Sequence, residues 1–208
     1  MFVCSCPALL HLLSFHRILP PVANREITSL ARLSVIGTVA VSSAEDVTSA
    51  VAAAQKAFLP WSSLTSKTRA SHMLRFHALC LQHKEALADL IVLENGKNKT
   101  EALADVAKGL ETVEYAISLP QLAQGRTLEV SRGITCTDTR RPLGVVASIV
   151  PFNFPFMVPM WTVPIALVMG NCVLLKPSEK VPLTMNYATR LMAEAGVPSG
   201  GFPGLPGT

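Results

Sequence analysis

Charged residues are scarce in this chain of 208 residues. Asp, Glu, Lys and Arg make up 15% of the sequence, hydrophobic residues make up 50%, and the net charge is +4. This composition excludes intrinsic disorder as the main state, and the length suits one or two domains with a real core. The sequence has no dense Lys/Arg stripe, which argues against nucleic-acid binding, and it has no internal repeat or low-complexity tract.

Cysteine and histidine are few and irregularly placed. The five cysteines are odd in number and lack the spacing of a secreted disulfide framework, which indicates a reducing interior. Cys4 and Cys6 lie too close to the N-terminus to form a metal site without further ligands. His72 and His77 are five residues apart, so one helix would not present them on the same face. We therefore predict no metal site.

The stretch from Leu143 to Leu175 has no charged residue and is long enough to span a bilayer. It contains four prolines and two asparagines, which would break the continuous helix that a membrane span requires. We therefore favour a folded, non-membrane segment. The interrupting residues are Pro151, Pro155, Pro159, Pro164, Asn153 and Asn171.

This stretch and the residues that follow it predict a β-α-β-α unit. An apolar, β-branched run over 143–150 is typical of a strand buried on both faces. A helix over 162–169, capped by Thr162, would stop at Gly170. A second strand over 172–175 and a helix over 182–195 would follow.

Such a crossover makes the two strands parallel, and open α/β sheets bind ligands at the carboxyl ends of their strands. That edge would carry Asn153 after the first strand and Lys176, Ser178 and Glu179 after the second. An amide, an ammonium and a carboxylate would then meet at one edge of an otherwise apolar sheet, which predicts a binding site there.

The rest of the chain divides into a helical part and two other segments. Helices are predicted over 43–58, ended by Pro60, over 68–82, over 85–94 with a stop at Asn95-Gly96, and over 100–118, ended before Pro120. Residues 124–140 are rich in Gly, Thr and Ser and predict extended or loop structure.

Residues 1–35 carry three arginines, several serines and only one acid, a composition that resembles a mitochondrial transit peptide. The apolar run over 8–13 is alternatively the core of a secretory signal, although it is short and lacks a basic start. A third interpretation is an aberrant start without a targeting role. We expect a mitochondrial location, and otherwise a cytoplasmic one.

The motifs PFNFP and GNCVLLKPSE, in this order and separated by one helix, resemble the aldehyde dehydrogenase superfamily. Phe152, within PLGVVASIVPFNFP, resembles the CoA-acylating methylmalonate-semialdehyde dehydrogenase branch in particular. The resemblance extends upstream through ENGKNKTEALADVAKGLETVEYA and covers about residues 39–200. It implies an α/β fold: a helical N-terminal layer plus the first β-α-β-α of a Rossmann-like parallel sheet, within an incomplete cofactor domain over 36–200.

The resemblance also implies a chemistry. The family oxidises an aldehyde through a cysteine hemithioacetal and passes hydride to NAD. In this branch, coenzyme A accepts the acyl group, and the substrates are methylmalonate and malonate semialdehydes from valine and pyrimidine breakdown. The full-length family member is expected to be a homo-oligomer, with 124–140 in its bridging strand pair. The partner expected for the site is a small-molecule aldehyde.

Asn153 matches the family's oxyanion-hole amide, which would donate a hydrogen bond to the charge that develops on the aldehyde oxygen. The sequence alone is equally consistent with an asparagine whose side chain only forms hydrogen bonds to the backbone of a turn. The resemblance favours the first interpretation.

Five further residues match cofactor contacts. Lys176 and Glu179 match contacts to the adenosine ribose, and a carboxylate there favours NAD over NADP. Lys180 would reach the adenine side, whereas Val150 and Phe152 match the nicotinamide end. The alternative for Lys176 and Glu179 is a surface ion pair or a helix cap.

The sequence also departs from the family. Lys108 stands where close relatives tend to have arginine, which changes the geometry available to a substrate carboxylate. Residues 201–208 look like a divergent, truncated tail. None of the five cysteines has the catalytic flanking pattern, and no general-base glutamate is recognised, so we expect the chain alone to be inactive. Alternatives are a non-catalytic protein that associates with full-length subunits and a non-acylating aldehyde dehydrogenase.

Overall fold

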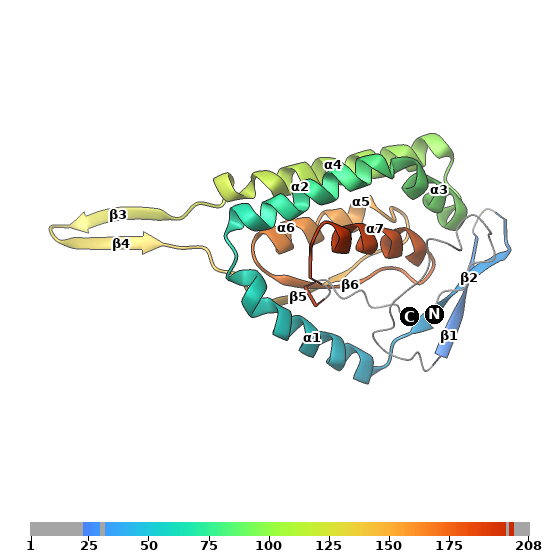
Figure 1. Ribbon diagram of the computed structural model, residues 1–208, viewed down its shortest axis with the longest axis horizontal. Helices are drawn as coiled ribbons and strands as arrows, with labels where there is room; N and C mark the ends of the chain where they lie inside the picture. Colours follow the sequence, from blue (N-terminus) through green and yellow to red (C-terminus); the bar gives the residue numbers. More distant parts are fainter. Residues whose placement is uncertain (1–22, 30–31, 199, 202–208) are drawn as a thin grey trace.

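The computed structural model describes residues 23–29, 32–198 and 200–201, which form an α/β structure with a central parallel strand pair (Figure 1). Helix α1 packs on one face of this pair. Helices α5, α6 and α7 lie on the other face, and α2, α3 and α4 pack on the outside of these three (Figure 1). The predicted α/β fold with a helical N-terminal layer is confirmed.

The β-α-β-α unit forms as predicted, with one helix divided in two. Its elements are β5 (Val145–Ile149), α5 (Met157–Met160), α6 (Val163–Val168), β6 (Cys172–Lys176) and α7 (Pro182–Glu194). Strands β5 and β6 are parallel, and Ile149 pairs with Lys176 at their carboxyl ends. The two loops that follow the strands therefore leave from the same edge.

The predicted cap of α6 is wrong. Thr162 stands directly before the helix, but it has helical backbone angles and its hydroxyl makes no capping bond. The hydroxyl instead donates to the carbonyl of Pro159 at 3.2 Å and shares a 2.7 Å hydrogen bond with Ser148. Because α5 runs almost directly into α6, the threonine hydroxyl faces the preceding turn rather than free amides ahead of it.

The prediction that the run 143–150 forms a strand buried on both faces is wrong for β5, and it is β6 that is buried on both faces. The residues from Cys172 to Leu175 in β6 are all buried, whereas the side chain of Ile149 in β5 is 77% exposed. Strand β6 has α1 on one face and α6 on the other, and the backbone of Gly201 accepts a hydrogen bond from Val173 at 3.0 Å. Among the described residues, β5 pairs only with β6, so its outer edge is open.

Four longer helices precede the sheet. They are α1 (Ala44–Ser62), α2 (Ser66–Gln82), α3 (Lys84–Asn95) and α4 (Lys99–Leu122). The stop at Gly96 is confirmed, since this residue has a φ of 84° and its amide donates back to Val92. The two ends predicted from proline are wrong, because Pro60 lies inside α1 and Pro120 inside α4.

Tertiary packing explains why these helices continue past their prolines. Trp61 is buried, and its indole N–H donates to the carbonyl of Leu167 at 3.0 Å, which holds the last turn of α1 against α6. In α4, Leu119 is buried and its carbonyl accepts from Ala123 at 2.8 Å. A proline in the last turn costs one intrahelical hydrogen bond, and burial of these neighbours outweighs that loss.

Two antiparallel hairpins complete the described fold. One consists of β1 (Ala23–Thr28) and β2 (Val35–Val41), which the sequence analysis did not predict, and the other of β3 (Arg126–Ser131) and β4 (Ile134–Asp138). The second hairpin confirms the extended structure expected over 124–140 and projects away from the remaining elements (Figure 1). Residues 1–22 of the predicted leader lie outside the described residues. No described helix has the length and hydropathy needed to cross a bilayer.

Candidate functional site

The carboxyl ends of β5 and β6 are joined directly. The amide of Val150 donates to the carbonyl of Lys176 at 3.2 Å, so the loop after β5 and the loop after β6 begin side by side. We call the edge formed by residues 150–154 and 176–180 the rim. The structure thus brings the sequence-predicted site residues to one edge, as the β-α-β-α pattern indicated.

A charged cluster lies on the β6 side of the rim. The ammonium of Lys176 lies 3.5 Å from one oxygen of Glu179, and the guanidinium of Arg25 lies 3.9 Å from the other. A backbone amide hydrogen bond at Glu179, followed by the charges of Lys176 and Arg25, lowers the pKa of this carboxyl below its ordinary value. The carboxylate is therefore ionised at neutral pH and partly open to solvent.

Arg25 contacts the rim through Glu179 and was not among the site residues predicted from the sequence. It belongs to β1, within the segment over which leader composition dominated the interpretation. The signal available in the sequence was the apolar Ile27 between the polar residues Glu26 and Thr28, and the structure buries Ile27 and exposes both neighbours.

The two rim loops also touch through a cation and an aromatic ring. The ammonium of Lys180 lies 4.7 Å from the centroid of the Phe152 ring, and both side chains are solvent-accessible. The amide of Lys180 donates to the hydroxyl of Ser178 at 3.3 Å, which shapes the turn before α7. The sequence analysis had assigned Phe152 and Lys180 to opposite ends of a cofactor.

Asn153 and Val150 differ in accessibility. The side chain of Asn153 is exposed and makes no hydrogen bond to another described residue, so its amide is free to donate to a ligand. Val150 is 8% exposed and packs in the core, so its side chain offers little surface to a ligand. Their assigned roles stay predictions.

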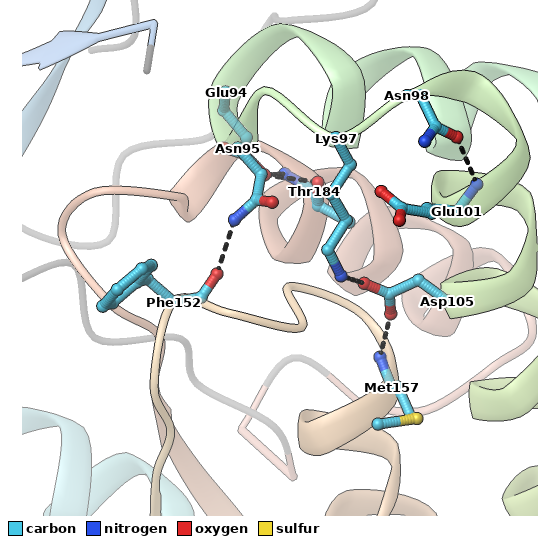
Figure 2. Close-up of polar contacts among 9 residues, drawn as sticks. All are labelled: Glu94, Asn95, Lys97, Asn98, Glu101, Asp105, Phe152, Met157 and Thr184. Carbon is cyan, nitrogen blue, oxygen red and sulfur yellow. Dashed lines mark hydrogen bonds and ion pairs between the residues drawn. The ribbon is translucent and has the colours of Figure 1, made fainter. Parts of the chain in front are cut away.

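The last two residues of α3 and the turn that leads to α4, residues 94–98, contact the loop after β5 and the start of α7 (Figure 2). We call residues 94–98 the connector. The buried carboxylate of Glu94 accepts hydrogen bonds from the amides of Leu183 at 2.7 Å and Thr184 at 3.0 Å, and also from the Thr184 hydroxyl. The side-chain amide of Asn95 donates to the carbonyl of Phe152 at 2.8 Å. The sequence predicted a helix stop at Asn95-Gly96 but indicated no role at the site for residues 94–98.

Burial dominates the ionisation of Glu94. Desolvation raises the pKa of this carboxyl to about 7, against the opposing effect of the hydrogen bonds from Thr184 and Leu183. Sequence spacing carries no sign of these contacts, because their partners lie about 90 positions further along the chain.

The described cysteines do not lie at the rim. Cys80 in α2 and Cys172 at the opposite end of β6 from Lys176 are fully buried, and burial raises the pKa of both thiols. Cys136 is exposed on the projecting hairpin. Within residues 23–29, 32–198 and 200–201, no group of three His, Cys, Asp or Glu side chains is arranged to hold a metal ion.

A cavity of about 840 Å³ lies between α1 and the β5–β6 pair. Its lining is mostly apolar and includes Val51, Phe58 and Ile149. Of the sequence-predicted site residues only Lys176 contributes to it, so the cavity lies beside the rim rather than within it.

Comparison with known proteins agrees with the rim motifs. The model of the aldehyde dehydrogenase family matches residues 23–208, a range that includes both β1 and the segment 201–208. Malonate-semialdehyde dehydrogenase 1 of Geobacillus kaustophilus is 46% identical over 84% of this chain, and the Bacillus subtilis malonate-semialdehyde dehydrogenase is 42% identical over 85%. The chain spans 36% and 37% of the length of these relatives.

Solved structures give the same result. The methylmalonate-semialdehyde dehydrogenase DddC from Oceanimonas doudoroffii superimposes with a TM-score of 0.90 at 37% identity, over 92% of this chain and 40% of that chain. A structure from Sinorhizobium meliloti 1021, named for methylmalonate-semialdehyde dehydrogenase and complexed with NAD, superimposes with a TM-score of 0.88 at 35% identity, over 90% and 38%. The chain therefore belongs to the aldehyde dehydrogenase family.

Proposed function

We propose that this chain supplies the cofactor-binding rim of an NAD-dependent aldehyde dehydrogenase that acts on malonate or methylmalonate semialdehyde. One observation carries the proposal: an ionised carboxylate, Glu179, stands beside Lys176 where two parallel strands end. A carboxylate at this place in an open α/β sheet suits the paired hydroxyls of a ribose. The names of the relatives support the substrate class.

The donors and acceptors of the rim fit a dinucleotide. Glu179 would accept hydrogen bonds from two ribose hydroxyls, and its charge would repel a 2′-phosphate, so NAD is preferred over NADP. Lys176 would donate to the same sugar. When bound, NAD would serve as the hydride acceptor in aldehyde oxidation.

The Lys180–Phe152 contact has a consequence for binding. With Phe152 at the nicotinamide end and Lys180 at the adenine end, the two side chains cannot remain in contact across a bound dinucleotide. Lys180 must then leave the ring. Both groups are solvent-accessible and cation–π contacts at exposed sites contribute only about 0.5–1 kcal/mol, so this movement is inexpensive.

At the other end of the rim, the exposed amide of Asn153 would donate to the oxygen of a bound aldehyde. A preorganised donor of this kind is worth about 2.7–4 kcal/mol when it points at developing negative charge. Lys108 is exposed on α4 and forms a 2.9 Å ion pair with Glu111, so its charge is already partly matched. We give it no part in substrate binding.

The finer features of the activity belong to the same proposal. Coenzyme A as the acyl acceptor, and a place in valine and pyrimidine breakdown, rest on the resemblance of the Phe152 motif. A homo-oligomer assembled through the β3–β4 hairpin is supported by the full exposure of both its strands. Inactivity of this chain alone is supported by the burial of Cys80 and Cys172 and by the position of Cys136.

The location and the boundaries at 35/36 and 200/201 stay predictions. The two malonate-semialdehyde dehydrogenases above come from bacteria and lend no support to a mitochondrial location. A fusion of residues 1–40 to a fluorescent reporter tests it, because a diffuse cytosolic signal contradicts targeting.

Saturation-transfer NMR on the purified chain tests the cofactor proposal and is suited to weak binding. We expect the ribose protons of NAD to receive saturation from the chain, and those of NADP to receive much less. Because a hydrogen bond to a charged group contributes about 1.5–3 kcal/mol, Glu179→Gln should weaken NAD binding roughly tenfold or more. Glu129→Gln, on the exposed strand β3, is the matched control.

Equal binding of NAD and NADP, or unchanged NAD binding after Glu179→Gln, would contradict the proposed role of the carboxylate. A second assay follows NADH formation from malonate semialdehyde and coenzyme A. We expect none from the purified chain, and measurable turnover would remove the claim that it is inactive alone.

A second candidate function is association with longer family members without catalysis. It is favoured by three exposed leucines on the outer helices, Leu74 and Leu81 of α2 and Leu122 of α4. Co-expression with a full-length relative, followed by affinity purification of the tagged chain, tests this. Recovery of the relative supports the role, and its loss after Leu74→Ser would place the contact on α2.

A further inference from the structure

The start of α7 is held from a distant part of the chain. The residue before the helix, Val181, has no side chain that can cap it, and Pro182 at the first position has no N–H. The first two amides able to donate are those of Leu183 and Thr184, and the carboxylate of Glu94 accepts from both. These hydrogen bonds satisfy two N-terminal amides for which α7 has no capping side chain of its own.

The loop after β5 is held by the next residue of the same connector. The side-chain amide of Asn95 donates to the carbonyl of Phe152 at 2.8 Å, one residue before Asn153 (Figure 2). Gly96 has a φ of 84°, which turns the chain immediately after this contact and directs Lys97 back toward the same loop.

Lys97 is a further residue of the connector that contacts the loop after β5. Its ammonium lies 3.8 Å from the centroid of the Phe154 ring and 2.9 Å from the buried carboxylate of Asp105. The other oxygen of Asp105 accepts from the amide of Met157 at 2.8 Å, at the start of α5 (Figure 2). Like α7, α5 has no side-chain cap of its own.

We propose that residues 94–98 are the positioning element of the rim: Asn95 holds the loop that carries Asn153, and Glu94 holds the start of α7, which directly follows the loop that carries Glu179. This inference rests on the proposed function, since it concerns the same rim. A dinucleotide and an aldehyde that bind across both loops require a constant separation between them. A connector bonded to the loop after β5 and to the start of α7 supplies that constraint, because catalytic groups must be held to within a fraction of an ångström.

Glu94 and Asn95 are assigned here as positioning residues. Their side chains bond the Phe152 carbonyl and the first amides of α7, so they would act on the rim through these groups. A purely structural role would change the stability of the fold without selectively changing the rim. The experiment must therefore separate stability from loop order.

Asn98 provides a matched control within the same connector. Its side-chain oxygen accepts from the amide of Glu101 at 2.9 Å and caps α4, without contact to either rim loop (Figure 2). Asn98→Ala should lower the melting temperature through loss of a helix cap. It should leave hydrogen exchange in 152–157 and 183–186 unchanged.

The test measures amide hydrogen exchange and the melting temperature of the whole chain in four variants. Asn95→Ala and Asn95→Asp, which keeps the shape but removes the N–H donor, should speed exchange in 152–157 about tenfold. The melting temperatures of both variants should lie closer to that of the parent chain than the melting temperature of Asn98→Ala does. Glu94→Gln should speed exchange in 183–186 by a similar factor.

NAD saturation transfer on the same samples links loop order to binding. We expect Asn95→Ala and Glu94→Gln to reduce it and Asn98→Ala to leave it unchanged. If exchange in 152–157 and 183–186 stays at the parent rate, or if Asn98→Ala speeds exchange there as strongly, the inference is overturned. If the parent chain binds no NAD, the proposed function fails, whereas the exchange data still decide whether the connector orders the loops.

Discussion

The ammonium of Lys97 lies 2.9 Å from the carboxylate of Asp105, with the Asp105 side chain fully buried and that of Lys97 16% exposed. Because the same carboxylate also accepts from the amide of Met157, this ion pair joins the connector 94–98, α4 and α5. The Lys97 ammonium also lies 3.8 Å from the centroid of the Phe154 ring, so this ion pair contacts the loop after β5.

Removing one partner of this pair should be costly. Asp105→Ala leaves the Lys97 charge and the Met157 amide without their partner, and we expect a loss of about 3–5 kcal/mol in the free energy of unfolding. Urea denaturation measures it. Asp89→Ala breaks the exposed Lys99–Asp89 pair instead and should cost less than about 1 kcal/mol. Equal losses of unfolding free energy in Asp105→Ala and Asp89→Ala would show that the buried ion pair contributes no more to stability than the exposed one.

Glu94 should make the stability depend on pH. Its pKa is raised from 4.5 to about 7, so between these values the folded chain keeps a proton that the unfolded chain releases. The stabilisation is complete below pH 4.5 and is lost as the pH rises through 7, by roughly 3 kcal/mol.

Urea denaturation at pH 5 and at pH 8 measures this dependence, and Glu94→Gln should reduce the difference between the two values. The comparison uses the difference, because the glutamine also alters the hydrogen bonds to Leu183 and Thr184. An unchanged difference in Glu94→Gln would assign the pH dependence to other groups. The lowered pKa of Glu179 acts in the opposite direction, with stabilisation lost as the pH falls below 4.5.

Gly109 should not tolerate a side chain. A Cβ at this position of α4 would lie 2.5 and 2.6 Å from two ring carbons of Phe156, which is fully buried. We expect Gly109→Ala to lower the free energy of unfolding by about 1–3 kcal/mol, despite the better helix propensity of alanine. Lys108→Ala, one residue earlier and exposed, should change it by less than about 0.5 kcal/mol. A Gly109→Ala chain as stable as the parent would show that the Phe156 ring can move.

Arg69 should be essential for joining α1 to α6. Its guanidinium donates to the carbonyl of Val168 at 2.8 Å, to that of Ser62 at 3.2 Å and to that of Leu64. Arg69→Met keeps the length of the side chain but leaves these carbonyls unpaired, at an expected cost of about 3 kcal/mol. Thermal unfolding measures it against Arg132→Met, in the exposed β3–β4 turn, which should melt like the parent chain. A small effect of Arg69→Met would mean that water replaces the guanidinium.

The local pattern of residues determined the β-α-β-α unit, the parallel strand pair and the placement of Asn153, Lys176 and Glu179 at one edge. Apolar runs, glycine stops and strand polarity are properties of neighbouring residues, so they can be recognised without knowing what packs against them. The end of α3 at Gly96 is predictable for the same reason.

Tertiary structure alone decided the rest. Pro60 and Pro120 stay within their helices because Trp61 and Leu119 are buried against other elements, and Ile149 is exposed because it lines the open cavity between α1 and the β5–β6 pair. The capping of α7 by Glu94 joins residues about 90 positions apart. Periodicity reports which side of an element is apolar, whereas hydrogen bonds between distant segments depend on how those sides come together in the folded chain.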